Sequence, residues 1–322
     1  MTQSNHSDSK PCRLALVGAG GMILEHGRAF ADVPGVELVG ITNRTRSKAE
    51  DVAKELGVPK VYDTIDEMYA ETKADLVVMA VYETAILDIA KNVFSHPWAV
   101  FMEKPIGLDL LEAREVGKAA ADAERQVWVG LNRRALGSTI AALDDLLDDP
   151  GPRFIHVQDQ QSLETARVIG HAENVVQNWM YANSIHLVDY LLAFGRGKAT
   201  SIEQITPWSF DEPGVVIAKV AFDSGDIGLY EAIWNGPGPW ACTVSTPRRR
   251  WELKPLESAK FQNADERILH DVDAVAADAD FKPGFRLQAE RVVDAWRGKE
   301  TTAPTIEDAL ATTELVASIY QS

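Results

Sequence analysis

The stretch "RLALVGAGGMILEHGRAF", residues 13–30, decides how the first half of this chain folds. Its first part, residues 13–20, is a short apolar run that ends in glycines. The residues that follow, "GMILEHGRAFADV" at 21–33, place apolar side chains at helical spacing. A short apolar run closed by glycine is typical of a buried strand, and the spacing after it is typical of a helix packed on that strand. We therefore expect one strand–helix unit of a parallel sheet here.

The same alternation continues to about residue 132. Further strands are expected at 36–43, 61–63, 75–81, 98–103 and 126–132, and further helices at 47–57, 64–72, 84–94 and 110–124. Repetition of this kind implies a doubly wound parallel sheet with helices on both faces, because the crossovers between parallel strands are right-handed. Ligands of such sheets bind beyond the carboxyl ends of the strands.

The pattern of the sequence changes after Leu131. Alternating apolar runs at 153–163 and within 201–256, separated by turn sequences such as "DSGD" and "NGPGP", favour an antiparallel meander. One helix is expected between these runs, at 183–195, and the chain closes with helices at 285–298 and 305–320.

Two domains follow from these patterns. We predict an α/β Rossmann domain, with a doubly wound parallel sheet, at residues 11–131. Residues 132–322 are predicted to form an α+β domain with a mostly antiparallel sheet. The family resemblance described below implies that this sheet is open and that the domain serves substrate binding and oligomer contacts. Residues 1–10, which are polar, are predicted to be a disordered tail.

The composition narrows the class of protein. A net charge of −16 over 322 residues argues against a general binder of nucleic acid or of anionic membranes. No apolar run approaches about 18 residues, so no membrane-spanning helix is expected. Two cysteines are too few for a disulfide framework and lack zinc-site spacing, so we expect a reduced, cytoplasmic setting.

The first candidate site is the loop "VGAGGMI", residues 17–23. Gly18 and Gly20 match the first two glycines of a dinucleotide-binding fingerprint, in which backbone approaches the pyrophosphate closely. The helix that begins near Gly21 would offer its N–H groups to the phosphates. Ile23 occupies the place of the third glycine. A plain strand–helix turn is the alternative, and the position after the first strand of a long βα series favours the cofactor site.

The second candidate site is "TNRTRSK", residues 42–48, at the end of the second strand. An NAD-specific site normally has an acidic residue here to bind the ribose hydroxyls, whereas this chain has Asn43 and Arg44. Because a guanidinium pairs with a phosphate in forked geometry, NADP(H) is favoured over NAD(H). The alternative is a solvated helix start whose basic side chains bind nothing.

The third candidate site is Glu103-Lys104-Pro105, where an apolar strand ends in an acid, an amine and a proline. A lysine at a strand end beside a nicotinamide ring can hold a substrate hydroxyl and steady its charge during hydride transfer. Pro105 restricts the backbone of Lys104 and so directs its side chain. The alternative is a charged strand exit followed by a proline that starts a helix.

The fourth candidate site lies on the helix at 183–195. Helical spacing places Asn183, His186, Asp189 and Tyr190 along one side, opposite an apolar side. A histidine in polar surroundings suits a proton acceptor, although a single helix histidine is more often structural. Nearby, Arg133 could clamp a carboxylate, and the rings of Trp179 and Tyr181 suit the apolar face of a sugar. Core packing is the alternative role for these aromatic residues.

Together these features resemble the Gfo/Idh/MocA family, named for glucose–fructose oxidoreductase, inositol dehydrogenase and the rhizopine catabolism protein. The resemblance covers residues 11–322: the Rossmann domain, the "EKP" stretch at 103–105, the H-x-x-D pair His186 and Asp189, and the closing "FRLQAERVVDAWRG…TIEDAL" segment. It implies that Lys104 binds the reacting hydroxyl or carbonyl, that His186 exchanges its proton, and that cofactor C4 gives or accepts a hydride.

The resemblance implies a full set of site residues. Those expected at the cofactor are Gly18, Gly20, Gly21, Met22, Ile23, Asn43, Arg44, Ala80, Val81, Tyr82, Glu103 and Lys104. Those expected at the substrate are Lys104, Arg133, Trp179, Tyr181, Asn183 and His186. No metal is expected, because Lys104 supplies the positive charge that a metal would otherwise give.

Two positions depart from the family pattern. Catalytically typical members carry an aspartate four residues before the histidine and a glycine two residues before it, where this chain has Ala182 and Ser184. The fourth strand's usual exit ends in histidine, where this chain has Ile86. The proton relay of this chain is therefore incomplete, or Asn183 or Tyr181 supplies the polar contact that the aspartate makes in typical members.

The sequence therefore predicts an NAD(P)-dependent dehydrogenase or reductase for the CH–OH group of a sugar, polyol or cyclitol, assembled as a homodimer or homotetramer through the C-terminal sheet. One alternative is a non-catalytic regulator that senses a dinucleotide or a sugar, which the missing aspartate favours. Another is a hydrolase that uses bound nicotinamide transiently.

Overall fold

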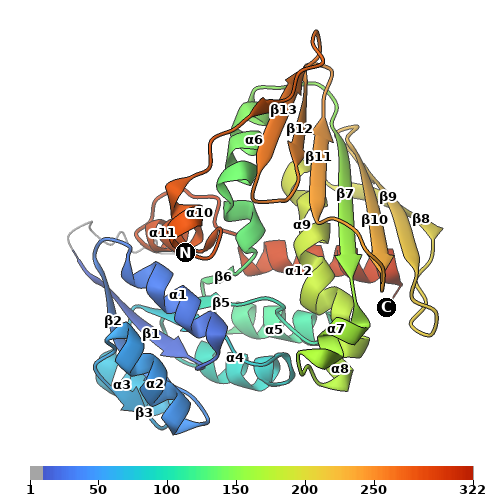
Figure 1. The fold of residues 1–322 in the computed structure, drawn as a ribbon. Coiled ribbons are helices and arrows are strands. Elements are labelled where there is room, and N and C mark those ends of the chain that lie inside the picture. Colours follow the sequence, from blue (N-terminus) through green and yellow to red (C-terminus); the bar gives the residue numbers. More distant parts are fainter. Residues whose placement is uncertain (1–9, 322) are drawn as a thin grey trace. The chain divides into compact units, whose positions relative to one another are not determined.

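The computed structural model of the protein describes residues 10–321, so most of the predicted tail lies outside the described residues (Figure 1). These residues form two compact units. The first unit holds the described residues up to Asn132 together with Ala279–Leu310, and the second holds Arg133–Asp278 together with the residues after Leu310. Within residues 10–321, no helix has both the length and the apolar character needed to cross a membrane.

The first unit contains a six-stranded sheet in which every pair of neighbouring strands is parallel. The strand order is β3-β2-β1-β4-β5-β6, the order of a Rossmann fold. Its strands are β1 (Cys12–Val17), β2 (Val36–Thr42), β3 (Val61–Tyr62), β4 (Leu76–Met79), β5 (Ala99–Met102) and β6 (Val127–Val129). This sheet confirms the predicted doubly wound fold.

Helices connect these strands, and each ends within two residues of its predicted end. They are α1 (Gly21–Ala31), α2 (Arg46–Leu56), α3 (Ile65–Thr72), α4 (Ile86–Phe94), preceded by the short turn η1 (Glu83–Ala85), and α5 (Leu110–Asp122). Local chemistry sets their ends. Gly57 closes α2 in the left-handed conformation, and the side chain of Asp109 caps α5 by accepting a hydrogen bond from the Glu112 N–H.

A helix from the end of the chain completes the first unit. Helix α11 (Phe285–Trp296) lies against α1, and its buried apolar residues join the core built by the Rossmann strands. After this helix, the Pro304 carbonyl accepts a hydrogen bond from the Val129 N–H at the edge of β6. The predicted second domain, residues 132–322, is therefore corrected. Its residues 279–310 belong to the first unit, because burial of the apolar face of α11 requires the α1 side of the Rossmann core.

The second unit contains an eight-stranded sheet of order β14-β13-β12-β11-β7-β10-β9-β8. Its strands are β7 (Phe154–Gln161), β8 (Ala199–Thr206), β9 (Val215–Phe222), β10 (Ile227–Trp234), β11 (Ala241–Ser245), β12 (Arg249–Leu253), β13 (Ala259–Asn263) and β14 (His270–Asp271). Strands β7 and β10 pair in parallel and the other neighbours are antiparallel. The sheet is thus mostly antiparallel, as predicted.

The two faces of this sheet differ. Along β7 and β10 every second side chain is buried, and α9 (Ile185–Phe194) packs on the buried face (Figure 1). Helix α6 (Gly137–Leu147), which the sequence patterns did not predict, contacts β12 and β13. The opposite face leaves Phe154, Val215 and Ile227 more than a third exposed.

The remaining helices are η2 (Asn132–Ala135), α7 (Leu163–Val168), α8 (Glu173–Gln177), η3 (Met180–Ser184), α10 (Ala276–Asp280) and α12 (Ile306–Tyr320).

Candidate functional site

The glycine turn after β1 has the geometry that a dinucleotide requires. Gly18 has φ +114°, and a Cβ there would lie 2.1 Å from the Ala80 carbonyl oxygen, so only glycine fits. This contact joins the loops after β1 and β4, which are neighbouring strands on either side of the point where the strand order reverses. Doubly wound sheets bind ligands at that point.

The start of α1 leaves room and donors for an anion. A Cβ added at Gly20 or Gly21 would meet nothing within 4 Å, and both residues are exposed. No side chain caps the helix, and its first turn carries no acidic residue. Its first N–H groups therefore face open space beside the glycine turn, which fits a pyrophosphate.

Ile23, in the place of the third glycine, is fully buried. Close packing of helices occurs one turn later, where a Cβ on Gly27 would lie 2.3 Å from a methyl carbon of Leu56 in α2. On the open side of the loop Met22 is 37% exposed, and beyond β4 Tyr82 is 72% exposed, with Ala80 and Val81 partly buried before it. Tyr82 thus offers an aromatic ring close to the glycine turn in the sheet.

The end of β2 is followed by an exposed guanidinium, that of Arg44. Arg44 is exposed and forms no hydrogen bond or ion pair with any residue in the described part of the chain. Its neighbour Asn43 donates its side-chain N–H to the Thr45 carbonyl at 2.9 Å. Arg46 instead pairs with Glu50 and Asp63. Of these two arginines, Arg44 is the one with free donors for a phosphate.

The exit of β5 is built around Glu103. One oxygen of this buried carboxylate lies 3.0 Å from His26 Nε2, and the other accepts the Lys104 backbone N–H at 2.7 Å. Gly130, after β6, leaves the space that the carboxylate fills, since a Cβ there would lie 3.2 Å from Glu103 Oε2. The main chain of Lys104 is therefore held in place while its side chain stays partly exposed.

The charge of Glu103 is stabilised by the same contacts. Burial by itself raises the pKa of this carboxyl group. The hydrogen bond and the electrostatic interaction with His26, together with the positive charge of Lys104, outweigh burial, so the pKa of Glu103 lies below its ordinary value. An ionised carboxylate therefore lies beside Lys104 at neutral pH.

Sequence reasoning missed His26. This residue of α1 is fully buried, stacks on Phe285 with ring centroids 4.4 Å apart, and meets the edge of Phe101. It thereby connects the helix of the glycine turn to the "EKP" stretch. Its partner Glu103 is 77 residues away in the chain, and no local pattern marks such a pair.

The second unit carries His186 on the first turn of α9. His186 is 8% exposed, and its ring centroid lies 6.1 Å from that of Trp240. Asn183, one turn earlier, donates its amide to Gln161 Oε1 at 2.8 Å, and Trp179 Nε1 donates to the same oxygen at 3.0 Å. Asn183 and Trp179 are thus brought together around one acceptor close to His186 in the chain.

The predicted aromatic residues are more buried than a stacking surface would be. Trp179 is 8% exposed and meets the edge of His171, and Tyr181 is 1% exposed. The partly exposed ring beside His186 is Trp240, whose Nε1 donates to the Gln160 carbonyl at 2.8 Å. Sequence reasoning missed Trp240, although its position after the turn sequence "NGPGP" was a usable signal, because turns at sheet edges often carry binding residues.

The two arginines after β6 have different partners. The Arg133 guanidinium carbon lies 5.5 Å from the ring centroid of Trp240, and its Nη1 donates to Glu257 at 2.9 Å. Arg134 instead forms two hydrogen bonds, at 2.8 and 2.7 Å, with the buried carboxylate of Asp189. Arg133 therefore belongs with Trp240 and His186, while Arg134 anchors α9.

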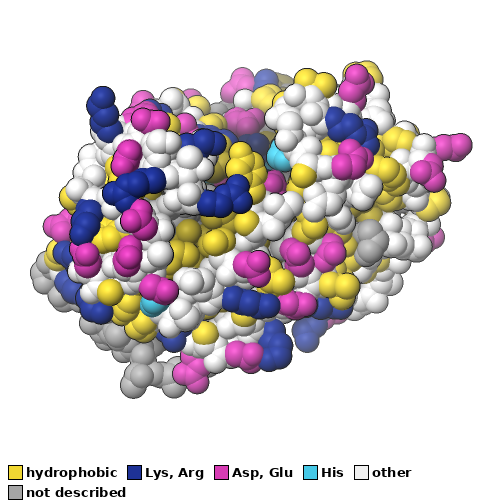
Figure 2. Space-filling model, turned by 90° about the horizontal axis from the view of Figure 1, so that it is seen from below, with side chains coloured by type: hydrophobic (Ala, Val, Ile, Leu, Met, Phe, Trp, Pro, Cys, Tyr) yellow, Lys and Arg dark blue, Asp and Glu magenta, His cyan; other side chains and the backbone are white. Residues whose placement is uncertain are grey.

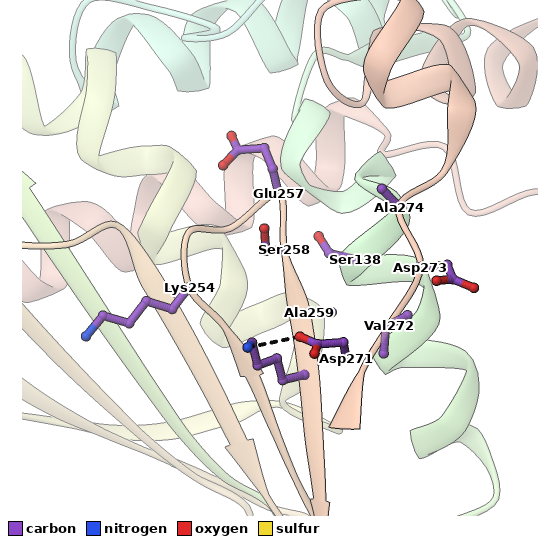
Figure 3. Close-up of a pocket in the computed structure, with 10 residues that line it drawn as sticks. Ser138, Lys254, Glu257, Ser258, Ala259, Asp271, Val272, Asp273 and Ala274 are labelled. Carbon is purple, nitrogen blue, oxygen red and sulfur yellow. Dashed lines mark ion pairs between the residues drawn. The ribbon is translucent and has the colours of Figure 1, made fainter. Parts of the chain in front are cut away.

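A cavity of about 330 Å³ opens in the second unit near this cluster. Its lining includes Ser138, Lys254, Glu257, Asp271 and Asp273, and Figure 3 shows Asp271 paired with a lysine. Glu257 lines the cavity and also binds Arg133, so the cavity adjoins the Trp240 cluster. Within residues 10–321 no group of three or more His, Cys, Asp or Glu side chains is arranged to hold a metal ion.

The predicted site residues are divided between the two units. The first unit contains all the predicted cofactor residues, and the second contains the predicted substrate residues apart from Lys104. On the face drawn in Figure 2, lysine and arginine side chains are interspersed with aspartate and glutamate rather than joined in one basic field.

Known proteins resemble the chain in sequence and in fold. A family model described as "Oxidoreductase family, NAD-binding Rossmann fold" matches residues 12–131. An inositol 2-dehydrogenase of Rhizobium meliloti is 30% identical over 122 residues, which are 38% of this chain and 36% of that enzyme. The chain thus spans about a third of the length of the first curated relatives that it matches.

Solved structures share the whole fold. A dehydrogenase from Chromobacterium violaceum superposes with a TM-score of 0.83 at 19% identity, covering 96% of this chain and 94% of that one. A levoglucosan dehydrogenase in complex with NADH and levoglucosan superposes with a TM-score of 0.82 at 14% identity, covering 96% of each chain. The oxidoreductase family model thus matches the Rossmann part of the chain, residues 12–131, and these solved structures share its fold over nearly the whole chain.

Proposed function

We propose that the protein is an NAD(P)-dependent oxidoreductase that transfers a hydride between nicotinamide C4 and the CH–OH or carbonyl carbon of a sugar, polyol or cyclitol. The observation that carries this proposal is Lys104, held by Glu103 at the carboxyl end of β5, in the same sheet as the glycine turn. A cation in that place suits a developing alkoxide.

The residues divide the chemistry between them. When bound, the nicotinamide supplies the hydride acceptor or donor. Lys104 binds the reacting oxygen and stabilises its negative charge, and the ionised Glu103 keeps the Lys104 main chain fixed. His186 accepts the hydroxyl proton during oxidation and returns it during reduction.

The preference for NADP(H) is part of the proposal. Arg44 lies at the end of β2, where dinucleotide-binding sheets meet the adenosine ribose, and its guanidinium has no partner among residues 10–321. Asn43 lacks the carboxylate that would bind the ribose hydroxyls of NAD. A 2′-phosphate would supply the two acceptors that the Arg44 guanidinium matches.

Trp240, Arg133 and Glu257 support a hydroxylated ring as the substrate. The Trp240 ring suits the apolar face of a sugar or cyclitol, and the ion pair beside it offers both donors and acceptors to hydroxyl groups. Because Glu257 already neutralises Arg133, this cluster suits an uncharged substrate better than a carboxylate. The names of the similar inositol and levoglucosan dehydrogenases agree with that class.

We also propose a cytoplasmic homodimer or homotetramer that forms through the outer face of the second-unit sheet. Phe154, Val215 and Ile227 on that face are 45%, 47% and 40% exposed, which fits a surface covered by a second copy. The two cysteines, Cys12 and Cys242, are both buried and free, which fits a reducing compartment.

The experiment that tests the proposed function replaces Lys104 by alanine and measures NADP-dependent oxidation of a panel of sugars, polyols and cyclitols. We expect turnover to fall about 10²- to 10³-fold, because the alkoxide loses its cation, while cofactor binding stays. Lys118→Ala, which removes an exposed lysine of α5 paired with Asp122, is the control and should keep full turnover. Unchanged turnover in Lys104→Ala would refute the assigned role.

A non-catalytic regulator on the same fold is the second candidate. The observation that favours it is Ala182, at the place where typical members have an aspartate. Its methyl group can neither accept nor donate a proton, as a carboxyl group can. Binding of a dinucleotide or sugar without any turnover across the panel would favour this candidate.

A further inference from the structure

Strand β7 buries two polar side chains next to each other on its inner face. Asp159 and Gln161 are each 1% exposed, although aspartate and glutamine are mostly surface residues. Buried polar groups of this kind must be hydrogen-bonded, and each unmade bond is costly. Their partners show what this pair holds in place.

Gln161 connects the strand to the segment before His186. Its Oε1 accepts hydrogen bonds from Trp179 Nε1 and Asn183 Nδ2, while its Nε2 donates to Asp159 Oδ1 at 2.7 Å. An indole N–H can only donate and a carboxylate can only accept. The Gln161 amide therefore has a single favourable orientation, which Asp159 and Trp179 determine from opposite ends.

Asp159 also holds the segment before His186 directly. It is hydrogen-bonded to Ser184, and its other oxygen accepts the Tyr230 hydroxyl at 2.6 Å. Tyr230 lies 2.7 Å from the Tyr320 hydroxyl, which in turn lies 3.4 Å from Ser184 Oγ. The network thus joins β7, β10 and the end of α12 to the residues just before α9.

These residues form an unusual helical turn. Met180–Ser184 is a π-helical turn, in which the Ile185 N–H reaches the Met180 carbonyl five residues back. Such turns are rare, they appear mostly as single turns inside α-helices, and they are frequent at functional sites. The network contacts this turn at Asn183 and Ser184, and His186 follows it two residues later. The network therefore fixes the point from which His186 projects.

We propose that Gln161 and Asp159 are positioning residues for His186, acting through the π-helical turn Met180–Ser184. Their role rests on the proposed function in one respect, namely that His186 exchanges the substrate proton. Gln161 fixes the positions of Trp179 and Asn183 through its hydrogen bonds to them. Asp159 in the same way fixes Gln161 and Ser184. Neither side chain needs to touch the substrate.

The test is the titration of the His186 imidazole, followed by NMR in the full-length protein with labelled histidine and assigned with a His186→Gln variant. Gln161→Met keeps the length of the side chain and removes the acceptor of Trp179 and Asn183. Gln158→Met is the matched control, because Gln158 lies on the opposite, outer face of β7. We expect the His186 midpoint to move by about half a pH unit or more in Gln161→Met and to stay in Gln158→Met.

A swapped double variant, Asp159→Asn with Gln161→Glu, separates positioning from simple packing. It keeps one carboxylate and one amide but exchanges their places. The amide introduced at position 159 can donate to the carboxylate introduced at position 161, which still accepts from Trp179 and Asn183. We expect the swap to bring the midpoint back toward the wild-type value. An unchanged midpoint in Gln161→Met, or a midpoint that the swap fails to restore, would overturn the proposal.

This titration needs neither substrate nor cofactor, so its outcome is independent of the Lys104→Ala experiment. If the protein turns over a substrate, the same variants should shift the pH–rate profile as they shift the His186 midpoint. A loss of thermal stability in Gln161→Met with an unchanged His186 midpoint would show that the network is merely structural.

Discussion

Asp159 is a carboxylic acid that folding removes from water. Burial raises its pKa to about 6, against the opposing effect of hydrogen bonds from Tyr230, Ser184 and Gln161. A second buried aspartate, Asp226, behaves in the opposite way. Its ion pair with Arg196 and the N–H groups of Arg153 and Arg196 outweigh burial, and its pKa falls to about 2.

The opposite pKa shifts predict opposite pH dependence of stability. A carboxyl group whose pKa is raised by folding stabilises the protein fully at pH values below its pKa in the unfolded chain. This stabilisation is lost as the pH rises toward 6. We therefore expect wild-type protein to lose about 3 kcal/mol of unfolding free energy, relative to Asp159→Asn, between about pH 3 and pH 7. Denaturant unfolding at a series of pH values measures this difference.

Asp226→Asn is the matched comparison. Folding lowers the pKa of Asp226, so this residue stabilises the protein at pH values above its pKa in the unfolded chain. The stabilisation is lost as the pH falls toward about 2. Wild-type protein should therefore exceed Asp226→Asn in stability at neutral pH, and this advantage should shrink in acid. The same sign of pH dependence in both variants would contradict the two assignments.

At the residue scale, the sequence was sufficient where a local pattern carries the chemistry. The fit of the glycine turn at Gly18 and the strand-end position of Lys104 could both be derived from their neighbours in the chain. The role of His26 could not, because it depends on a contact with Glu103, far away in the chain. Trp240 follows a turn sequence that was a usable signal for its position, but its contact with the distant Arg133 could not be derived. A single sequence contains no signal for such pairs.

At the scale of elements, α11 shows how packing decides the domain to which a segment belongs. Phe285 is 2% exposed and stacks on His26, and the helix lies against α1. The apolar spacing of residues 285–298 indicates a helix with one buried face. Spacing does not say which partner covers that face, which is why sequence reasoning placed the helix in the second domain.

Phe285→Ala tests this packing. We expect the free energy of unfolding to fall by about 3–5 kcal/mol, because the change removes a buried aromatic ring from the Rossmann core. Glu290→Ala, on the exposed side of the same helix, should cost much less. Equal losses in denaturant unfolding of the two variants would show that α11 does not contribute to that core.

Two other elements show the limits of sequence patterns. Helix α6 begins with Gly137, Ser138 and Thr139, which are weak helix formers, so its helical signal was low. It forms because it packs on β12 and β13. The parallel pairing of β7 with β10 joins strands that are far apart in sequence, and alternation of side chains cannot distinguish parallel from antiparallel neighbours.

At the scale of the whole molecule, the chain leaves the first unit after Asn132 and returns to it at Ala279. The sequence predicted the first crossing because the periodicity of apolar residues changes there. It did not predict the return, because residues 279–310 look like any helix at the end of a domain. The predicted cofactor residues all lie in the first unit, and the proposed proton acceptor lies in the second.

The central claim is that the first unit binds a nicotinamide dinucleotide, with Arg44 at the 2′-phosphate. The measurement that tests it most directly is fluorescence titration of the protein with NADPH and with NADH, repeated with Arg44→Ala. Arg46→Ala is the control, because Arg46 is already paired with Glu50 and Asp63. We predict tight NADPH binding that weakens about 10- to 100-fold in Arg44→Ala and is retained in Arg46→Ala, with NADH affinity unchanged. Failure of the wild-type protein to bind either nucleotide would contradict the account.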